Sequence, residues 1–273
     1  MRLIAVGHWE SVVGCARSAI GDSRSALIGG VSLVLAACAT VGSAATPDAP
    51  AMPQAMLARA IDVAGGEAAL RRARVLEWDG DATVHAGARN VEISGHWTVV
   101  PPDSAIVDTY AVAQGPATRR ALAIAAPNGW VVRGTQFTPL PAAVLANERD
   151  AFFLYSVMLL APLSASGVRL TGIGPDSVGQ RGFRAEAPDR PAVDLYVDAT
   201  GRLSHVAATI ADAEGGAPVR EDLWLDGSLD SAGIRWPRTI RILLRGVPYF
   251  DLTLRTLEVR GETKDARLKG PGA

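Results

Sequence analysis

The stretch VLEWDGDATVHAGARNVEISGHWTVV, residues 75–100, decides the fold of this chain. Apolar and polar residues alternate along both of its arms, and Gly87-Ala88 lies between them, which predicts two antiparallel strands joined by a tight turn. Pairing Trp78 with Trp97 gives one face that is apolar throughout and one that is polar throughout. Because a slip of one residue would mix the two faces, the alternation specifies this register strongly.

The register assigns the residues of the hairpin to its two faces. The apolar face is predicted to carry the pairs Leu76/Val99, Trp78/Trp97, Gly80/Gly95, Ala82/Ile93 and Val84/Val91. The polar face is predicted to carry the pairs Glu77/Thr98, Asp79/His96, Asp81/Ser94 and Thr83/Glu92. An apolar face of this kind has to be covered by another element.

The rest of the sequence predicts a mainly β chain with a few helices. Apolar residues at helical spacing indicate short helices at 54–64 and 67–73, separated by Gly65-Gly66. Further strands are predicted at 105–113, 121–126, 130–133, 183–187, 193–210 (a hairpin that turns at 198–201), 221–226, 238–244 and 250–259. We expect a single domain over residues 54–260, followed by a charged, frayed tail at 261–273.

One longer helix is predicted at 147–160, in the middle of the chain. Asn147 is a good N-cap, and Glu148 and Asp150 would occupy the first turn, where the helix dipole favours acidic residues. The body of the helix, AFFLYSVMLL, is apolar nearly all the way round. Such a helix must be buried on more than one side.

Residues 26–37, ALIGGVSLVLAA, form an uncharged apolar run that follows Arg24. The run is too short to span a bilayer, which takes about 20 residues, and is typical of the core of a secretory signal. Its end, Leu35-Ala36-Ala37-Cys38, resembles the lipobox of bacterial lipoproteins. The resemblance implies a signal peptide at 1–37 with a long n-region, acylation of Cys38 (for example with palmitate), and a flexible tether at 38–53.

Two destinations in the cell envelope are compatible with this segment. Ala39, not Asp, follows Cys38, and in Gram-negative bacteria that pattern implies an outer membrane lipoprotein facing the periplasm. Small residues also precede Ala44 and Ala45 in a pattern that suits ordinary signal peptidase. Cleavage there would leave a soluble periplasmic protein.

Composition excludes several kinds of partner and bond. With 27 basic and 28 acidic residues the chain is nearly neutral, so no nucleic-acid partner is expected. The cysteines are Cys15 and Cys38. The first would leave with the signal peptide and the second would carry lipid, so the mature fold is expected to have no disulfide.

No pattern in the sequence predicts catalysis, a metal ion or a cofactor. The predicted register places His85 opposite Asn90 and His96 opposite Asp79. These two rows are about 20 Å apart at roughly 3.3 Å per residue, too far for the histidines to share a metal. The sequence motifs of serine hydrolases, zinc proteases and thiol redox proteins are missing. We therefore expect a protein that is not an enzyme.

Three local patterns resemble the LolA/LolB-like lipoprotein-carrier superfamily. They are IDVAGGEAAL (61–70) before the first strand, LYVDATGRL (195–203) at a hairpin turn and GIRWP (233–237) before a long strand. The order of the predicted elements is similar too. The resemblance implies a strongly curved antiparallel sheet, or half-barrel, closed by short helices, whose apolar hollow holds acyl chains or other hydrophobic ligands.

The first hairpin and the long helix would line this hollow. The candidate ligand contacts are Trp78, Ile93, Trp97 and Val99 from the hairpin and Phe152, Phe153, Tyr155 and Met158 from the helix. If the hollow is open, the protein carries or senses a lipid, an acyl chain or another hydrophobic small molecule. If the same side chains fill it, the protein is an interaction module that binds another envelope protein.

Overall fold

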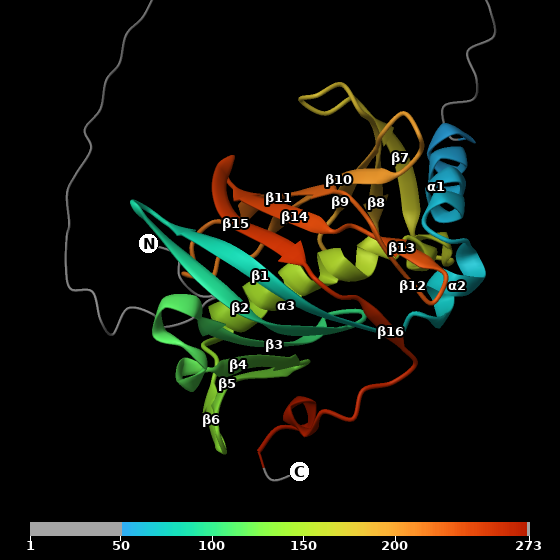
Figure 1. Cartoon of the computed structure of the whole chain (residues 1–273). Coiled ribbons are helices and arrows are strands. Elements are labelled where there is room, and N and C mark those ends of the chain that lie inside the picture. The colour runs from blue at the N-terminus through green and yellow to red at the C-terminus, as the bar shows by residue number, and fades with distance from the viewer. Residues whose placement is uncertain (1–50, 272–273) are drawn as a thin grey trace, which may run out of the picture.

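A computed structural model describes residues 51–271 of the chain. Most of the strands belong to one 14-stranded antiparallel sheet, and a two-stranded sheet lies beside it. The longest helix, α3 (Ala142–Met158), runs along one face of the large sheet (Figure 1). The predicted fold class, mainly β with a few helices, is confirmed. The segment expected to be a signal peptide, Cys38 and nearly all of the expected tether lie outside the described residues.

The first half of the large sheet is a meander in which each strand pairs with the next. Its strands are β1 (Val75–Ala86), β2 (Arg89–Val100), β3 (Ser104–Ala111), β4 (Arg120–Ala125), β5 (Asn128–Arg133) and β6 (Gln136–Pro139). Two single-turn 3-10 helices, Val112–Gln114 and Pro116–Thr118, connect β3 to β4.

The second half follows α3 and a short 3-10 turn, Ala161–Ser164. Its strands are β7 (Arg169–Ile173), β8 (Arg181–Glu186), β9 (Val193–Val197), β10 (Leu203–Ile210), β11 (Val219–Asp226), β14 (Thr239–Leu244) and β15 (Val247–Leu254). The small sheet, β12 (Leu229–Ser231) with β13 (Ile234–Trp236), is inserted between β11 and β14. Pairing of β15 with β1 joins the two halves, and β16 (Glu258–Arg260) pairs with the start of β1.

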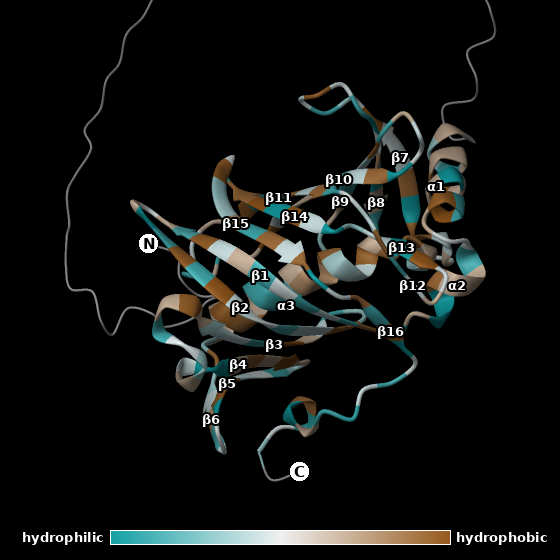
Figure 2. Cartoon of the chain, viewed as in Figure 1, coloured by the Kyte–Doolittle hydropathy of each residue, from teal (hydrophilic) through white to brown (hydrophobic). Residues whose placement is uncertain are grey.

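The register predicted for the first hairpin is confirmed at every pair, from Leu76/Val99 to Val84/Val91. The alternation is visible along β1 and β2 in Figure 2. Side chains of the apolar face are buried except for the half-buried Val91, and Trp78 is only 1% exposed. On the polar face, His96 Nδ1 lies 3.0 Å from Asp79 Oδ1. The alternation therefore fixes both the pairing and the face that meets the core.

The shape of the sheet differs in part from the expectation. The sheet is open, with β6 and β7 at the two ends of the strand order, and a strongly curled half-barrel is not confirmed. The element that covers its apolar face is the 17-residue α3. The short helices α1 (Ala51–Val63) and α2 (Glu67–Arg72) lie at one end of the sheet, near β7 and β13 (Figure 1). The Arg235 amide there donates to the Ala64 carbonyl.

The start of α3 corrects the prediction made for the long helix. The helix begins at Ala142, directly after Pro141, and ends at Met158. The added turn is rich in alanine, the residue with the highest helix propensity, so the helix extends toward its N-terminus. Asn147 consequently lies inside the helix and is not its N-cap. Its side-chain amide donates to the Ala211 carbonyl at 2.6 Å.

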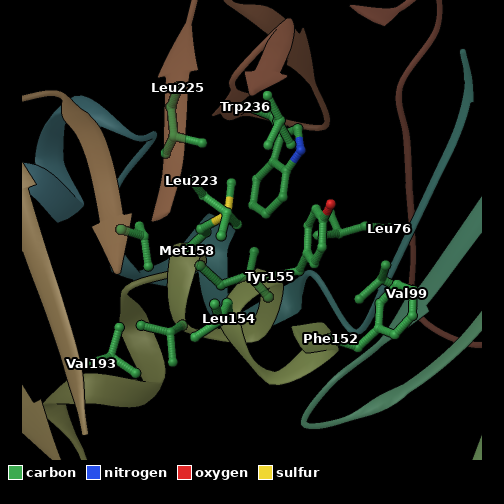
Figure 3. Packing of buried hydrophobic residues seen from close by; sticks show 14 of the residues in the cluster. Leu76, Val99, Phe152, Leu154, Tyr155, Met158, Val193, Leu223, Leu225 and Trp236 are labelled. Carbon is green, nitrogen blue, oxygen red and sulfur yellow. The ribbon is translucent and has the colours of Figure 1, made fainter. Parts of the chain in front are cut away.

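A single large apolar core lies between α3 and the sheet. Figure 3 shows side chains from α3, the first hairpin and β11 meeting in this core, among them Leu76, Val99, Leu154, Met158 and Leu223. Leu154, on α3, is fully buried. Much of the interior is thus filled by side chains.

The charged tail is not frayed over its described residues, which corrects that expectation. Its 3-10 turn, Ala266–Lys269, lies against the outer face of β3 and β4. Arg267 Nη1 donates to Asp108 Oδ2 at 2.7 Å, and Leu268 packs on the small apolar cluster that contains Ile106 and Ala123. The ion pair and this apolar contact explain why the segment is held.

Candidate functional site

A cavity of about 70 Å³ lies between α3 and the sheet. Its walls come from β2, β3, α3, β11, the β14–β15 hairpin and the loop after β10. The lining residues are Ile93, Trp97, Val107, Asn147, Glu148, Ala151, Phe152, Tyr155, Ala213, Glu221, Ile242, Leu244, Tyr249 and Phe250. The walls are mainly apolar and aromatic, with a small number of polar groups, which is the usual character of a small-molecule site.

The lining residues differ in solvent exposure, and we call the half-buried ones the rim of the cavity and the buried ones its floor. Asn147, Leu244 and Tyr249 are half-buried and form the rim. Trp97 and Tyr155 are buried and form the floor, at 4% and 7% exposure. A group that enters past the rim would therefore meet aromatic rings away from bulk water.

Hydrogen bonds fix α3 against the end of β10. The Asn147 amide donates to the Ala211 carbonyl at 2.6 Å, and the Ala211 amide donates to Asp150 Oδ2 at 2.9 Å. Burial raises the pKa of Asp150 above its ordinary value, although the hydrogen bond from Ala211 acts in the opposite direction. These two side chains therefore hold the backbone of Ala211 through its N–H and its C=O, and fix the cavity wall in place.

A second set of contacts fixes α3 to the loop before β3. Arg149 Nη2 and Arg190 Nη1 donate to Asp103 Oδ2 at 2.7 and 2.8 Å, and the Ser156 hydroxyl donates to the Pro102 carbonyl at 2.7 Å. Burial alone would raise the pKa of Asp103, but the two guanidinium groups hold it below its usual range. The helix is thus anchored on both sides of the cavity.

Glu148 projects from α3 into the cavity. Glu148 is 2% exposed, and its Oε1 has no hydrogen-bond partner among the residues that the structure describes. Burial raises the pKa of Glu148 to about 8, and the charge of Glu221 acts in the same direction. A carboxyl in this setting holds its proton up to neutral pH.

Glu221 reaches the same cavity from β11. Burial alternates along this strand, and Glu221, at 4% exposure, lies on the face that also carries Val219 and Leu223. Burial, followed by the charges of Glu221 and Glu148, raises the pKa of Tyr155 above its ordinary value. The polar part of the cavity is therefore acidic in character.

The structure brings half of the predicted ligand contacts together. Ile93, Trp97, Phe152 and Tyr155 line the cavity. Trp78 and Val99 belong to the filled core instead, at 1% and 0% exposure. That these eight residues contact a ligand stays a prediction.

The two remaining residues lie elsewhere on α3. Met158 borders a smaller gap of about 30 Å³, beside Trp236. Phe153 is half-buried, and the guanidinium carbon of Arg190 lies 5.1 Å from its ring centroid. The helical periodicity turns Phe153 away from the face that carries Phe152 and Tyr155, whereas Met158 lies one turn beyond Tyr155, at the end of the helix.

Sequence reasoning missed the two acids. It placed Glu148 in the exposed first turn of a helix that starts five residues further along than α3 does. The spacing i, i+4, i+7 of Glu148, Phe152 and Tyr155 was a usable signal, because it puts all three on one helix face. The period of two that places Glu221 beside Val219 and Leu223 was another.

Outside the cavity, His205 on β10 is a buried polar residue, at 4% exposure. Its ring lies between those of Tyr196 and Trp224, at centroid distances of 4.9 and 3.9 Å. Its nitrogens lie 3.3 Å from Asp176 Oδ2 and 3.1 Å from Asp222 Oδ1. Within residues 51–271 no group of three or more His, Cys, Asp or Glu side chains is arranged to hold a metal ion. None of the helices described there is both long and apolar enough to cross a membrane.

Comparison with known proteins gives structural matches only. No family model and no curated protein sequence matches the chain. A LolA superfamily protein from Nitrosomonas europaea is 11% identical with a TM-score of 0.48, over 78% of this chain and 96% of that one. A protein domain from Vibrio parahaemolyticus, described as outer membrane lipoprotein-sorting, is 12% identical with a TM-score of 0.45, over 74% and 96%.

A DUF1329 family protein from Desulfovibrio piger is 10% identical with a TM-score of 0.48, over 80% of this chain and 97% of that one. The solved structures that are similar to this chain thus include a LolA superfamily protein, from the group that the sequence patterns resemble, at low sequence identity. At these identities the likeness concerns the arrangement of the chain alone.

Proposed function

We propose that this chain is a non-enzymatic protein of the bacterial cell envelope that binds a hydrophobic ligand between α3 and the sheet, as a carrier or sensor. The observation that supports the proposal is the cavity itself, where Trp97, Phe152 and Tyr155 enclose a space with an accessible rim. Apolar walls with a small number of polar groups suit a lipid or acyl chain better than a polar metabolite.

The size of the cavity limits what it takes in the described conformation. At about 70 Å³ it is well below the roughly 300–1,000 Å³ of pockets that enclose a drug-sized ligand. It therefore admits one end of a ligand, with the rest lying over the rim formed by Leu244 and Tyr249, or it widens when the β14–β15 hairpin moves. The ligand site is accordingly proposed at the Trp97 end of the interior and not at the Trp78 end.

The experiment is native mass spectrometry of residues 39–273, exported to a bacterial periplasm and purified without detergent. Adducts that denaturation releases as lipid are the expected result, and they would identify the class of cargo. A clean mass that stays unchanged when lipids are offered would contradict ligand binding.

A pair of matched variants locates the site. Ala151 lines the cavity, whereas Ala146 lies on the exposed side of the same helix. Ala151→Leu places a larger side chain in the cavity and is expected to reduce the adduct, and Ala146→Leu makes the same change outside it and is expected to leave the adduct unchanged. Equal adducts in both variants would place the ligand elsewhere.

A second candidate function is an interaction module with a filled core. The observation that favours it is the burial of Trp78, Val99 and Leu154, which are at most 1% exposed and do not line the cavity. In this case the polar face of the sheet would bind another envelope protein. A clean apo mass together with a specific partner in cross-linking from whole cells would favour this function.

A further inference from the structure

The cavity contains two buried acids and no basic residue. Glu148 on α3 and Glu221 on β11 line it from different walls, and none of the described residues around it is Lys, Arg or His. Oε1 of Glu148 has no hydrogen-bond partner in residues 51–271. A buried carboxyl whose hydrogen bonds are unmade lowers the stability of the fold. That cost is offset if a ligand supplies the missing donor.

We propose that the cavity takes an amphiphilic amine, whose ammonium group pairs with Glu148 and whose apolar part lies against Trp97 and Phe152. This inference rests on the proposed function, because it names the class of hydrophobic ligand that the same cavity binds. Glu221 lines the same cavity from β11, so the head group would lie between two acidic side chains.

The polar and aromatic groups of the cavity match an ammonium group in two respects. An ammonium carries several N–H donors, which a carboxylate accepts in strong charge-assisted hydrogen bonds. The rings of Trp97, Phe152 and Tyr249 line the same space, and cations are attracted to aromatic faces. A carboxylate head group, as in a fatty acid, would add a third acid to the cavity, and a neutral alcohol would supply no positive charge to pair with Glu148.

Proton balance gives the pairing a pH dependence. Because burial raises the pKa of Glu148 to about 8, the acid carries a proton at neutral pH, and binding of an ammonium would release it. The affinity for the amine is therefore expected to rise between pH 6 and about pH 8.5. The titratable groups that face Glu148 across the cavity are Glu221 of β11, Tyr155 of α3 and Tyr249 of β15, while β2 and β3 contribute apolar side chains only.

The test compares three probes with the same short apolar part, since a cavity of about 70 Å³ admits a small ligand. Binding of hexylammonium, 1-hexanol and hexanoate to the full chain is measured by calorimetry. Hexylammonium is expected to bind at least about tenfold more tightly than the other two, a difference of about 1.4 kcal/mol. Glu148→Gln is expected to abolish this preference while leaving 1-hexanol binding intact, which also shows that the variant is folded.

A matched control is Glu92→Gln, the same substitution at an exposed position on the outer face of β2. It is expected to leave the binding of all three probes unchanged. Equal binding of hexylammonium and 1-hexanol, or an amine affinity that Glu148→Gln does not lower, would overturn the inference and leave the hydrophobic site standing. Binding of none of the three probes would overturn the inference together with the proposed function.

Discussion

The indole of Trp78 on β1 contacts the phenol ring of Tyr155 on α3, with the ring centroids 5.8 Å apart and the planes at 30°. Tyr155 also stacks on Phe152, at 5.7 Å and 28°. Tyr155 and Phe152 line the cavity, and Trp78 does not. Tyr155 therefore marks the boundary between the filled and the hollow part of the interior, and the two parts make different predictions.

In the filled part, Trp78→Ala is expected to lower the free energy of unfolding by about 3–5 kcal/mol, because it removes a fully buried aromatic ring from a packed core. Denaturant titration measures the change. Trp78→Phe keeps an aromatic ring and deletes the indole Nε1, which has no hydrogen-bond partner within residues 51–271, so it should cost less. A loss below about 1 kcal/mol for Trp78→Ala, with ligand uptake abolished, would instead place Trp78 in an open cavity.

In the hollow part, the buried acid gives stability a pH dependence. The folded pKa of Glu148, about 8, is above the ordinary value of 4.5, so the folded state holds the proton over a range in which the unfolded chain has released it. The free energy of unfolding should therefore fall as the pH rises from about 4.5 to 8, by at most about 1.4 kcal/mol per pH unit.

Glu148→Gln removes this titration, because the amide is neutral at every pH. Stability measured from pH 5 to 9 should fall less steeply in the variant than in the parent protein, and the variant should be the more stable of the two at pH 9. Parallel curves would show that Glu148 titrates normally and is hydrated.

Hydrogen bonds to the backbone of Ala211 hold α3 in position. Asp150→Ala removes the acceptor of the Ala211 amide and should lower the free energy of unfolding by about 1–3 kcal/mol, since that buried donor loses its partner. Asp150→Asn keeps an oxygen at the same place and is the control, expected to cost less. Equal losses in the two variants would mean that the charge of Asp150, and not the hydrogen bond, holds the helix.

The sequence predicted the hairpin of β1 and β2 in full because a period of two leaves a single register for its apolar face. It missed β6, β7, β12 and β13, which have three to five residues each and are too short for a periodic signal, and it merged the start of β16 with β15 in one strand at 250–259. It misplaced the start of α3 because Asn147 has the chemistry of an N-cap, and only the tertiary contact with Ala211 shows its other role.

The candidate site, like the fold, was predicted from the sequence only in part. Trp97, Phe152 and Tyr155 followed from the apolar face of the hairpin and from the apolar helix, whereas Tyr249 and Phe250 were not predicted. The packing that closes the space around Trp78 and leaves it open near Trp97 depends on side chains from β11, β14 and β15, which contact those faces only in the folded chain. No local pattern specifies such long-range packing.

The contact of the tail with the sheet predicts a local effect on stability. Arg267→Ala removes the ion pair with Asp108 and should cost about 1 kcal/mol, because both partners are partly exposed. Hydrogen exchange should be faster in the tail and at the β3–β4 face that it covers, and unchanged in α3. The exposed Lys264 provides the control, and Lys264→Ala should alter neither measurement. Equal exchange in all three proteins would show that the tail contact adds nothing to stability.

The membrane anchor expected at Cys38 gives the last prediction. If Leu35-Ala36-Ala37-Cys38 is a lipobox, Cys38 is the acylated residue, and two or more acyl chains bind a membrane stably where one does not. Cys38→Ala should therefore release the protein from the membrane fraction or block its maturation, whereas Cys15→Ala, in the segment that is removed, should change neither. Fractionation of cells followed by intact-mass measurement reads out both effects. If the amount of Cys38→Ala protein in the membrane fraction is unchanged, the lipobox prediction is contradicted. Cleavage near Ala44 or Ala45, with another means of membrane attachment, would then be favoured.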